Sequence, residues 1–190
     1  MIGLWIALGA IGVIIVWLIA TFNGLITLRN RTDEAWSDID VQLKRRYDLI
    51  PNLVETVKGY AGHEKEVFEK VTLARAAAIN AEKSGNPAEI AKTENMLAGT
   101  LKSLFAVAES YPDLKANKDF LKFQEELSST ENRIAGARKY YNGAVMYYDN
   151  ARQGFPGNIV ARLFTGKFPG RDYFEIQDPT DRKAPPVSTA

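Results

Sequence analysis

The feature that most constrains this chain is an uninterrupted apolar segment near its N-terminal end. The residues from Ile2 to Phe22 include no charged side chain. At about 1.5 Å of rise per residue, a helix of this length reaches roughly 30 Å, which is the thickness of the hydrocarbon core of a bilayer. We therefore predict a membrane-spanning helix, because a buried core helix is usually shorter and has a polar face.

The residues that flank the segment indicate what kind of membrane helix it is. Only Met1 precedes it and Thr21-Phe22-Asn23-Gly24 follows, so it lacks both the basic start and the small-residue cleavage site of a secretory signal peptide. We expect an uncleaved anchor. The Lys and Arg residues near the segment all follow it, which predicts that the body faces the cytoplasm and leaves the opposite orientation as the alternative; they are Arg29, Arg31, Lys44, Arg45 and Arg46.

Composition excludes several classes of function. The 24 Lys and Arg nearly balance the 23 Asp and Glu, so no nucleic-acid partner is expected. The chain has no cysteine and one histidine, His63, so neither a Cys-based metal site, nor a His-Glu-x-x-His zinc site, nor a Ser-His-Asp triad can be built. No phosphate-binding Gly-rich loop is present. We predict no catalytic residue, no metal site and no cofactor, and hence a protein that is not an enzyme.

After the anchor, helical spacing dominates the sequence. Pro51 lies within the first helical pattern, which runs from Trp36 to Val57, and it predicts a kink or local break near Leu49 and Ile50. Gly59 with Gly62 marks the end of that helix. A second helix is expected at about 63–83, a third is capped by Asn86, and a last long one is capped by Asn117. Apolar or aromatic residues recur at helical spacing at Trp36, Ile39, Leu43, Ile50 and Val57, at Val67, Val71, Ala74 and Ala78, at Ile90, Leu97, Leu101, Leu104 and Ala108, and at Phe120, Phe123, Leu127, Ile134, Tyr141, Val145 and Tyr148.

These patterns predict an all-α fold. A transmembrane helix continues into an elongated antiparallel three- or four-helix bundle and is completed by a C-terminal amphipathic arm. The expected segments are an anchor at 1–28, a bundle at 29–153, an arm at 154–177 and a Pro-rich tail at 178–190.

The most specific stretch of the sequence is 41–60, VQLKRRYDLIPNLVETVKGY. It closely resembles the hallmark of the LemA family of bacterial membrane proteins. The resemblance continues through most of the chain and leaves out the Pro-rich tail; it includes His63-Glu64 and residues 72–76, 108–117, 130–135, 138–142 and 155–158.

The resemblance implies an N-terminal membrane helix, an elongated helical bundle and a location in the bacterial inner membrane. It implies no established catalytic activity. One branch of the family is associated with building magnetosome membranes, and family genes often neighbour a membrane-bound zinc metalloprotease, so a membrane-protein partner is a possible consequence.

Three groups of residues are candidates for interactions. Lys44, Arg45 and Arg46 fan around a helix, and they either contact a neighbouring subunit or lipid, or form ion pairs within the chain, for example to Glu109 or Glu131. Gly3, Ala7 and Ala10 form a small-residue stripe suited to self-association in the membrane, although glycine is common in spanning helices. The arm has the composition of an interfacial helix or of a docking arm onto the next subunit, through Phe155, Ile159, Leu163 and Phe164.

Three hypotheses for function follow. The first is a non-catalytic, membrane-anchored scaffold that self-associates into a homo-oligomer in the bacterial inner membrane, with the lipid bilayer as its constant partner. The second is a membrane-shaping protein that acts through its amphipathic segment. The third is a regulator of a membrane metalloprotease.

Overall fold

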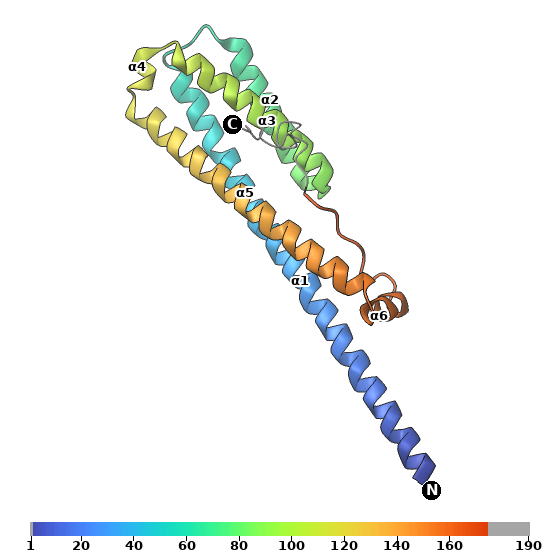
Figure 1. The fold of residues 1–190 in the computed structure, drawn as a ribbon. Helices are drawn as coiled ribbons and strands as arrows, with labels where there is room; N and C mark the ends of the chain where they lie inside the picture. Colours follow the sequence, from blue (N-terminus) through green and yellow to red (C-terminus); the bar gives the residue numbers. More distant parts are fainter. Residues whose placement is uncertain (1, 175–190) are drawn as a thin grey trace, which may run out of the picture. The chain divides into compact units, whose positions relative to one another are not determined.

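The computed structural model describes residues 2–174, which form six helices and, over that range, no strand. The helices are α1 (Ile2–Lys58), α2 (Lys65–Ser84), α3 (Pro87–Glu109), α4 (Pro112–Lys115), α5 (Lys118–Gln153) and α6 (Gly157–Leu163) (Figure 1). The predicted all-α fold is therefore confirmed. The predicted tail at 178–190 and the last residues of the arm lie outside the described range.

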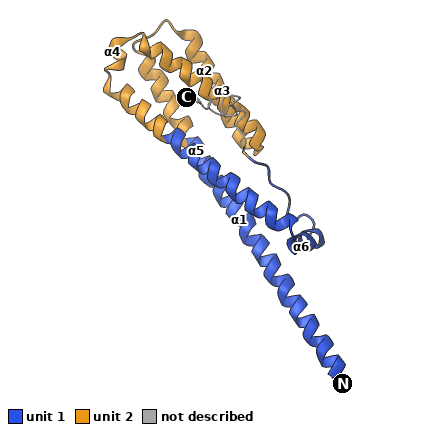
Figure 2. Ribbon diagram, viewed as in Figure 1, with its two compact units in different colours: residues 1–44, 130–173 blue, residues 45–129, 174–190 orange. Residues whose placement is uncertain are grey.

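The chain divides into two compact units (Figure 2). Among the described residues, the first unit comprises 2–44 and 130–173, and the second comprises 45–129 and 174. The predicted boundaries of anchor, bundle, arm and tail remain a prediction, because this division follows compactness alone.

In the first unit, α1 and α5 run antiparallel. The Trp36 ring packs on the Tyr141 ring at 5.1 Å, while Trp17, nearer the start of α1, packs on Phe155, just beyond the end of α5. The core of this unit contains Leu25, Tyr148, Val160 and Phe168. Leu25, Tyr148 and Val160 lie on α1, α5 and α6, and Phe168 lies beyond the end of α6. The burial of their side chains holds this unit together.

In the second unit, the end of α1, the antiparallel pair α2 and α3, and the start of α5 form the bundle. Gly85 has a φ of 67° and ends α2 in the left-handed conformation that glycine adopts without strain. The Asn86 side chain then accepts hydrogen bonds from the backbone N–H groups of Ala88 and Glu89, at 3.0 and 3.3 Å. The Asn117 side chain likewise accepts from the N–H of Phe120 at 2.9 Å. Both predicted caps are confirmed.

The predicted apolar stripes are largely buried, and the exceptions are Trp36, Val67 and Phe123, which are half-buried. On α2, Phe68 and Ala81 are buried as well. The second helix begins at Lys65, two residues beyond His63, and Glu64 is its N-terminal flanking residue. This agrees with the expected position to within a turn.

The sequence predicts either a kink or a local break at Pro51, and the break was wrong. α1 continues as α-helix to Lys58 with Pro51 inside it. The carbonyl that loses its helical donor at this proline accepts a hydrogen bond from α2 instead.

Candidate functional site

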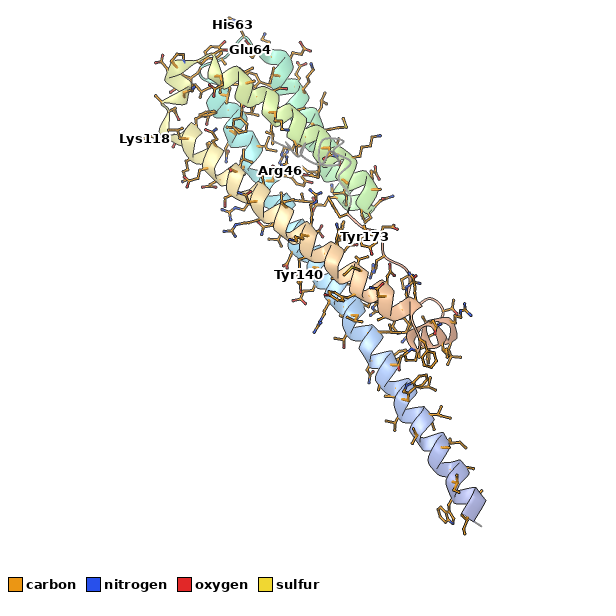
Figure 3. All side chains as sticks on the ribbon, viewed as in Figure 1. Arg46, His63, Glu64, Lys118, Tyr140 and Tyr173 are labelled. Atoms are coloured by element: carbon orange, nitrogen blue, oxygen red, sulfur yellow. The ribbon has the colours of Figure 1, made fainter. Side chains whose placement is uncertain are left out.

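A buried ion pair joins α1 to α3 in the second unit. Arg46 Nη1 donates to Glu94 Oε2 at 2.7 Å, and the Tyr47 hydroxyl donates to Glu94 Oε1 at 2.6 Å. Arg46 and Glu94 are only 3% and 4% exposed. Figure 3 labels Arg46 on α1. A buried carboxylate of this kind is tolerated because both its oxygens accept short hydrogen bonds.

The same group of residues supplies a hydrogen bond that α1 lacks at Pro51. A proline has no N–H, so the carbonyl of the residue four positions earlier, Tyr47, loses its helical donor. Arg75 of α2 replaces that donor, because its Nε donates to the Tyr47 carbonyl oxygen at 2.7 Å. Tyr47 therefore connects to α3 through its side chain and to α2 through its backbone.

The Tyr47 hydroxyl of this cluster holds its proton firmly. Burial, and after it the charge and hydrogen bond of Glu94, raise the pKa of Tyr47 well above its ordinary value. The phenol therefore remains a hydrogen-bond donor at all physiological pH values. Because its groups bond one another, the cluster of Arg46, Tyr47, Arg75 and Glu94 serves to join helices, and we call it the buried polar cluster.

The three basic residues of the sequence motif do not share one environment. Lys44 and Arg45 are exposed, whereas Arg46 is buried. For Arg46 the structure shows the intramolecular alternative, with Glu94 in the place we had expected Glu109 or Glu131 to occupy. Glu109 instead pairs with Lys115 at 2.6 Å. Lys44 and Arg45 stay predicted interaction residues.

Sequence reasoning missed Glu94 and Arg75, although a signal for Glu94 was present. Glu94 lies four residues after Ile90 and three before Leu97, within the buried seam of α3. Arg46 lies three residues after Leu43 in the seam of α1. Two opposite charges, each at a seam position of a helix, are the pattern that predicts a buried pair.

The small-residue stripe lies on the exposed apolar part of α1. Gly3, Ala7 and Ala10 are all exposed, and a Cβ atom placed at Gly3 meets nothing within 4 Å. Of the described helices, α1 alone is long and apolar enough to cross a membrane, and none of its most apolar window is buried. Self-association through the stripe stays a prediction.

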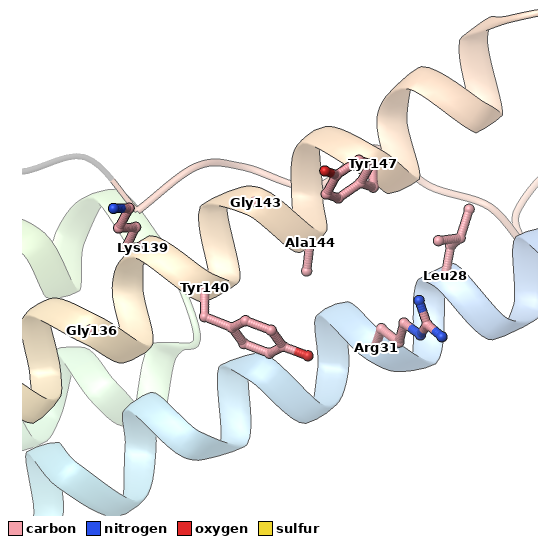
Figure 4. Close-up of a pocket in the computed structure, with 8 residues that line it drawn as sticks. All are labelled: Leu28, Arg31, Gly136, Lys139, Tyr140, Gly143, Ala144 and Tyr147. Atoms are coloured by element: carbon pink, nitrogen blue, oxygen red, sulfur yellow. The ribbon is translucent and has the colours of Figure 1, made fainter.

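A groove of about 580 Å³ lies between α1 and α5 in the first unit (Figure 4). Leu28 and Arg31 line it from α1, and Gly136, Tyr140, Gly143 and Tyr147 line it from α5. The two glycines leave space in the groove because they have no side chain, and the exposed rings of Tyr140 and Tyr147 form part of its wall. It is a mostly apolar surface with basic residues beside it, and we call it the α1–α5 groove.

α5 carries two pairs of adjacent tyrosines, Tyr140–Tyr141 and Tyr147–Tyr148, and each pair has one exposed and one buried ring. Tyr141 and Tyr148 are buried, and their hydroxyls donate to the carbonyl oxygens of Asp172 and Pro169, each at 2.9 Å. The place of these two in the predicted apolar stripe is confirmed. Tyr140 and Tyr147 are exposed, because adjacent helical residues point about 100° apart and only one of each pair can face the core.

Within the predicted arm, residues 155–168, which are called the arm from here on, pack against α1 of their own chain in the first unit. Phe155 contacts Trp17, and Phe164 and Phe168 contact Phe22, with ring centroids 5.8, 4.8 and 5.3 Å apart. Val160 and Phe168 are buried, while the predicted interaction residues Phe155, Ile159, Leu163 and Phe164 are exposed. Their contact with another subunit stays a prediction.

Among the described residues, no group of three or more His, Cys, Asp or Glu side chains comes together in a way that could hold a metal ion. His63 is exposed, and Glu64 is half-buried. What the geometry offers is a set of surfaces: an exposed apolar helix, a groove and an apolar arm.

These features define a class, namely all-α proteins in which a helix able to cross a membrane continues into a bundle. The model of the LemA family matches residues 35–188. The chain therefore belongs to the LemA family.

Named relatives agree with this assignment. Protein LemA of Metamycoplasma hominis is 30% identical over 141 residues, which cover 74% of this chain and 63% of that protein. Magnetosome protein MamQ 2 of Paramagnetospirillum magneticum is 26% identical over 182 residues, covering 83% of this chain and 66% of that protein. Magnetosome protein MamQ of Magnetospirillum gryphiswaldense is 24% identical, covering 83% and 65% respectively. The chain thus spans slightly less than two thirds of the length of each of these relatives.

Proposed function

We propose that this protein is a non-catalytic helical scaffold that is anchored in the bacterial inner membrane by α1 and self-associates there. The observation that carries the proposal is the character of α1. No residue of its most apolar window is buried, yet the same uninterrupted helix continues into the packed bundle and ends at Lys58. Exposed apolar surface on this scale is stable within lipid, where it costs no hydration free energy.

Surfaces on the first unit support self-association. The small-residue stripe lets two spanning helices approach closely in the membrane. The α1–α5 groove begins at Leu28, just beyond the apolar segment, and its glycines leave space for a side chain or helix of a second copy. The exposed Lys44, in the first unit, and the exposed Arg45, in the second, are further contacts in the proposal. The body faces the cytoplasm in this proposal, because the basic residues follow the anchor.

The relatives' names are consistent with a membrane role. Two of them are named magnetosome proteins. The other, protein LemA, names no reaction. A scaffold requires no reaction either, so the proposal uses surfaces and no active site.

The test is the absolute mass of the full-length protein in mild detergent, measured by light scattering beside residues 29–190 alone. A discrete oligomer for the full-length protein, lost on removal of residues 1–28, supports a scaffold assembled through its anchor. A monomer in both cases contradicts self-association.

Variants locate the interface. Arg45→Glu should lower the mass of the assembly and leave the helical circular dichroism unchanged, because Arg45 is exposed. Lys118→Glu, an exposed charge reversal at the start of α5, is the matched control. An equal mass for wild type and Arg45→Glu would remove Arg45 from the interface.

A second candidate function is membrane shaping. The exposed apolar face of the arm favours it, because amphipathic segments that enter one leaflet can bend a membrane. Phe164→Asp should then abolish the deformation of anionic liposomes by the purified protein. Unchanged deformation would refute this role for the arm.

A further inference from the structure

The arm lies where the apolar part of α1 ends. Phe22 closes the uncharged segment, and it contacts both Phe164 and Phe168. Trp17, five residues earlier, contacts Phe155. Five residues of helix correspond to about 7.5 Å, so Phe155 lies roughly that much deeper along α1 than Phe164 does. Interfacial helices bury their apolar faces about 5–10 Å into the boundary of headgroups and acyl chains, so this depth matches such a position.

The arm has two apolar sides. Its inner side, with Val160 and Phe168, is buried in the core of the first unit. Its outer side remains uncovered, with Phe155 77% and Leu163 66% exposed. A contiguous apolar face beside a membrane-spanning helix is stable in contact with lipid and unfavourable in water.

The charges around the arm have one sign. From 150 to 171 the chain contains basic residues and no Asp or Glu. Two of the basic residues are engaged, since Arg152 pairs with Asp149 and Arg171 with Asp33. Arg162 and Lys167 are exposed, and Lys167 Nζ lies 5.7 Å from the centre of the Phe22 ring. Lys167 therefore lies beside the end of the apolar segment, and Arg162 lies on α6 of the same arm.

We propose that the arm, residues 155–168, is a second membrane contact, which inserts Phe155, Leu163 and their neighbours into the headgroup layer and binds anionic phospholipid phosphates through Arg162 and Lys167. The inference rests on the proposed anchoring by α1. It adds a partner, anionic lipid, and a consequence. A helix held by its span alone can slide and rotate in the bilayer, whereas a span with an attached interfacial arm has a fixed depth.

The test uses the absence of cysteine from the chain. Leu163→Cys in the full-length protein is labelled with an environment-sensitive fluorophore and reconstituted into vesicles of phosphatidylcholine alone or mixed with phosphatidylglycerol. Ala135→Cys, exposed on the same unit but roughly 30 Å back along α5 from Phe155, is the matched control. The expected result is a blue shift at 163, with quenching by lipids that carry a spin label near the headgroup, and neither effect at 135.

The lipid dependence tests the charges. The blue shift at 163 should be larger with phosphatidylglycerol, and Arg162→Gln together with Lys167→Gln should remove that difference. A shift that is the same in both vesicles would overturn the contact with anionic lipid.

Two further outcomes separate this proposal from the one on which it rests. If the protein floats with the vesicles but the label at 163 stays in water, the arm proposal is overturned and anchoring stands. If the protein does not float, anchoring itself fails. A shift at 163 that depends on protein concentration, with no quenching by lipid, would assign the outer face to a second copy of the chain and also overturn the proposal.

Discussion

Arg75 Nε donates a hydrogen bond of 2.7 Å to the carbonyl oxygen of Tyr47, the acceptor that Pro51 leaves without its helical donor. This contact explains how α1 passes through a proline as continuous helix. It also ties the position of α2 to that of the proline. The stretch around Pro51 is thus a junction, where one side chain completes the hydrogen bonding of another helix.

The first prediction concerns this contact. Arg75→Met should lower the free energy of unfolding by about 1–3 kcal/mol, because it leaves a carbonyl without a donor. The loss should be smaller in a Pro51→Ala background, where the new N–H can bond the Tyr47 carbonyl. Denaturation of the four proteins in detergent, followed by circular dichroism, measures both losses. Equal losses in the two backgrounds would contradict the account.

The second prediction concerns the ion pair of Arg46 and Glu94. Glu94→Leu alone should destabilise the protein by about 3–5 kcal/mol, because it leaves a buried charge without its partner. Adding Arg46→Met should restore a large part of that loss. The exposed pair of Glu109 and Lys115 is the control, and Glu109→Gln should cost about 1 kcal/mol or less. A double variant as unstable as the sum of the single ones would show that the pair is not coupled.

The third prediction is a dependence on alkaline pH. Burial and Glu94 raise the pKa of Tyr47 above that of the unfolded chain, which lies at about 10. The protonated phenol therefore stabilises the fold fully below about pH 10, and this contribution is lost as the pH rises further. Stability measured from pH 8 to 11 should fall less steeply in Tyr47→Phe than in wild type. Parallel curves would contradict the assignment. A residual fall is expected, because burial raises the pKa values of Tyr141 and Tyr148 as well.

The fourth prediction concerns the start of the arm. A Cβ atom at Gly157 would lie 1.9 Å from the carbonyl oxygen of Ala151, which belongs to the backbone of α5. Gly157→Ala should therefore displace the arm and reduce the contact of Phe155 with Trp17, seen as a change in tryptophan fluorescence. Gly99→Ala is the control, because a Cβ there meets nothing within 4 Å. That change should stabilise α3 by about 0.5–1 kcal/mol. Identical fluorescence in Gly157→Ala and wild type would refute the close approach.

Sequence reasoning succeeded where the determinants are local. The caps at Asn86 and Asn117 each act within three residues, and the apolar stripes repeat at the period of the helix. The candidate sites were harder. Arg46 meets Glu94 across 48 positions and Arg75 meets Tyr47 across 28, so each contact depends on how helices pack. Pro51 shows the consequence, since its local rule predicted a kink or a break, and a distant side chain supplies a hydrogen bond to the carbonyl that the proline leaves without a donor.

The exposed face of the arm shows the same difference between properties that depend on local sequence and properties that depend on how helices pack. Its apolar and basic composition was evident from the sequence. Its place beside Phe22 was not, because α6 and the end of the apolar segment of α1 are far apart along the chain and come together only in the folded first unit.

The measurement that tests the central claim most directly is the accessibility of single cysteines in bacterial cells, to a maleimide that does not cross membranes. Ile2→Cys and Ser128→Cys occupy exposed positions at the start of α1 and in the body, and the chain offers no competing cysteine. A spanning α1 with a cytoplasmic body predicts that position 2 reacts in intact cells and that position 128 reacts only after the cells are permeabilised. Equal reaction of the two positions in intact cells would contradict a membrane-spanning anchor.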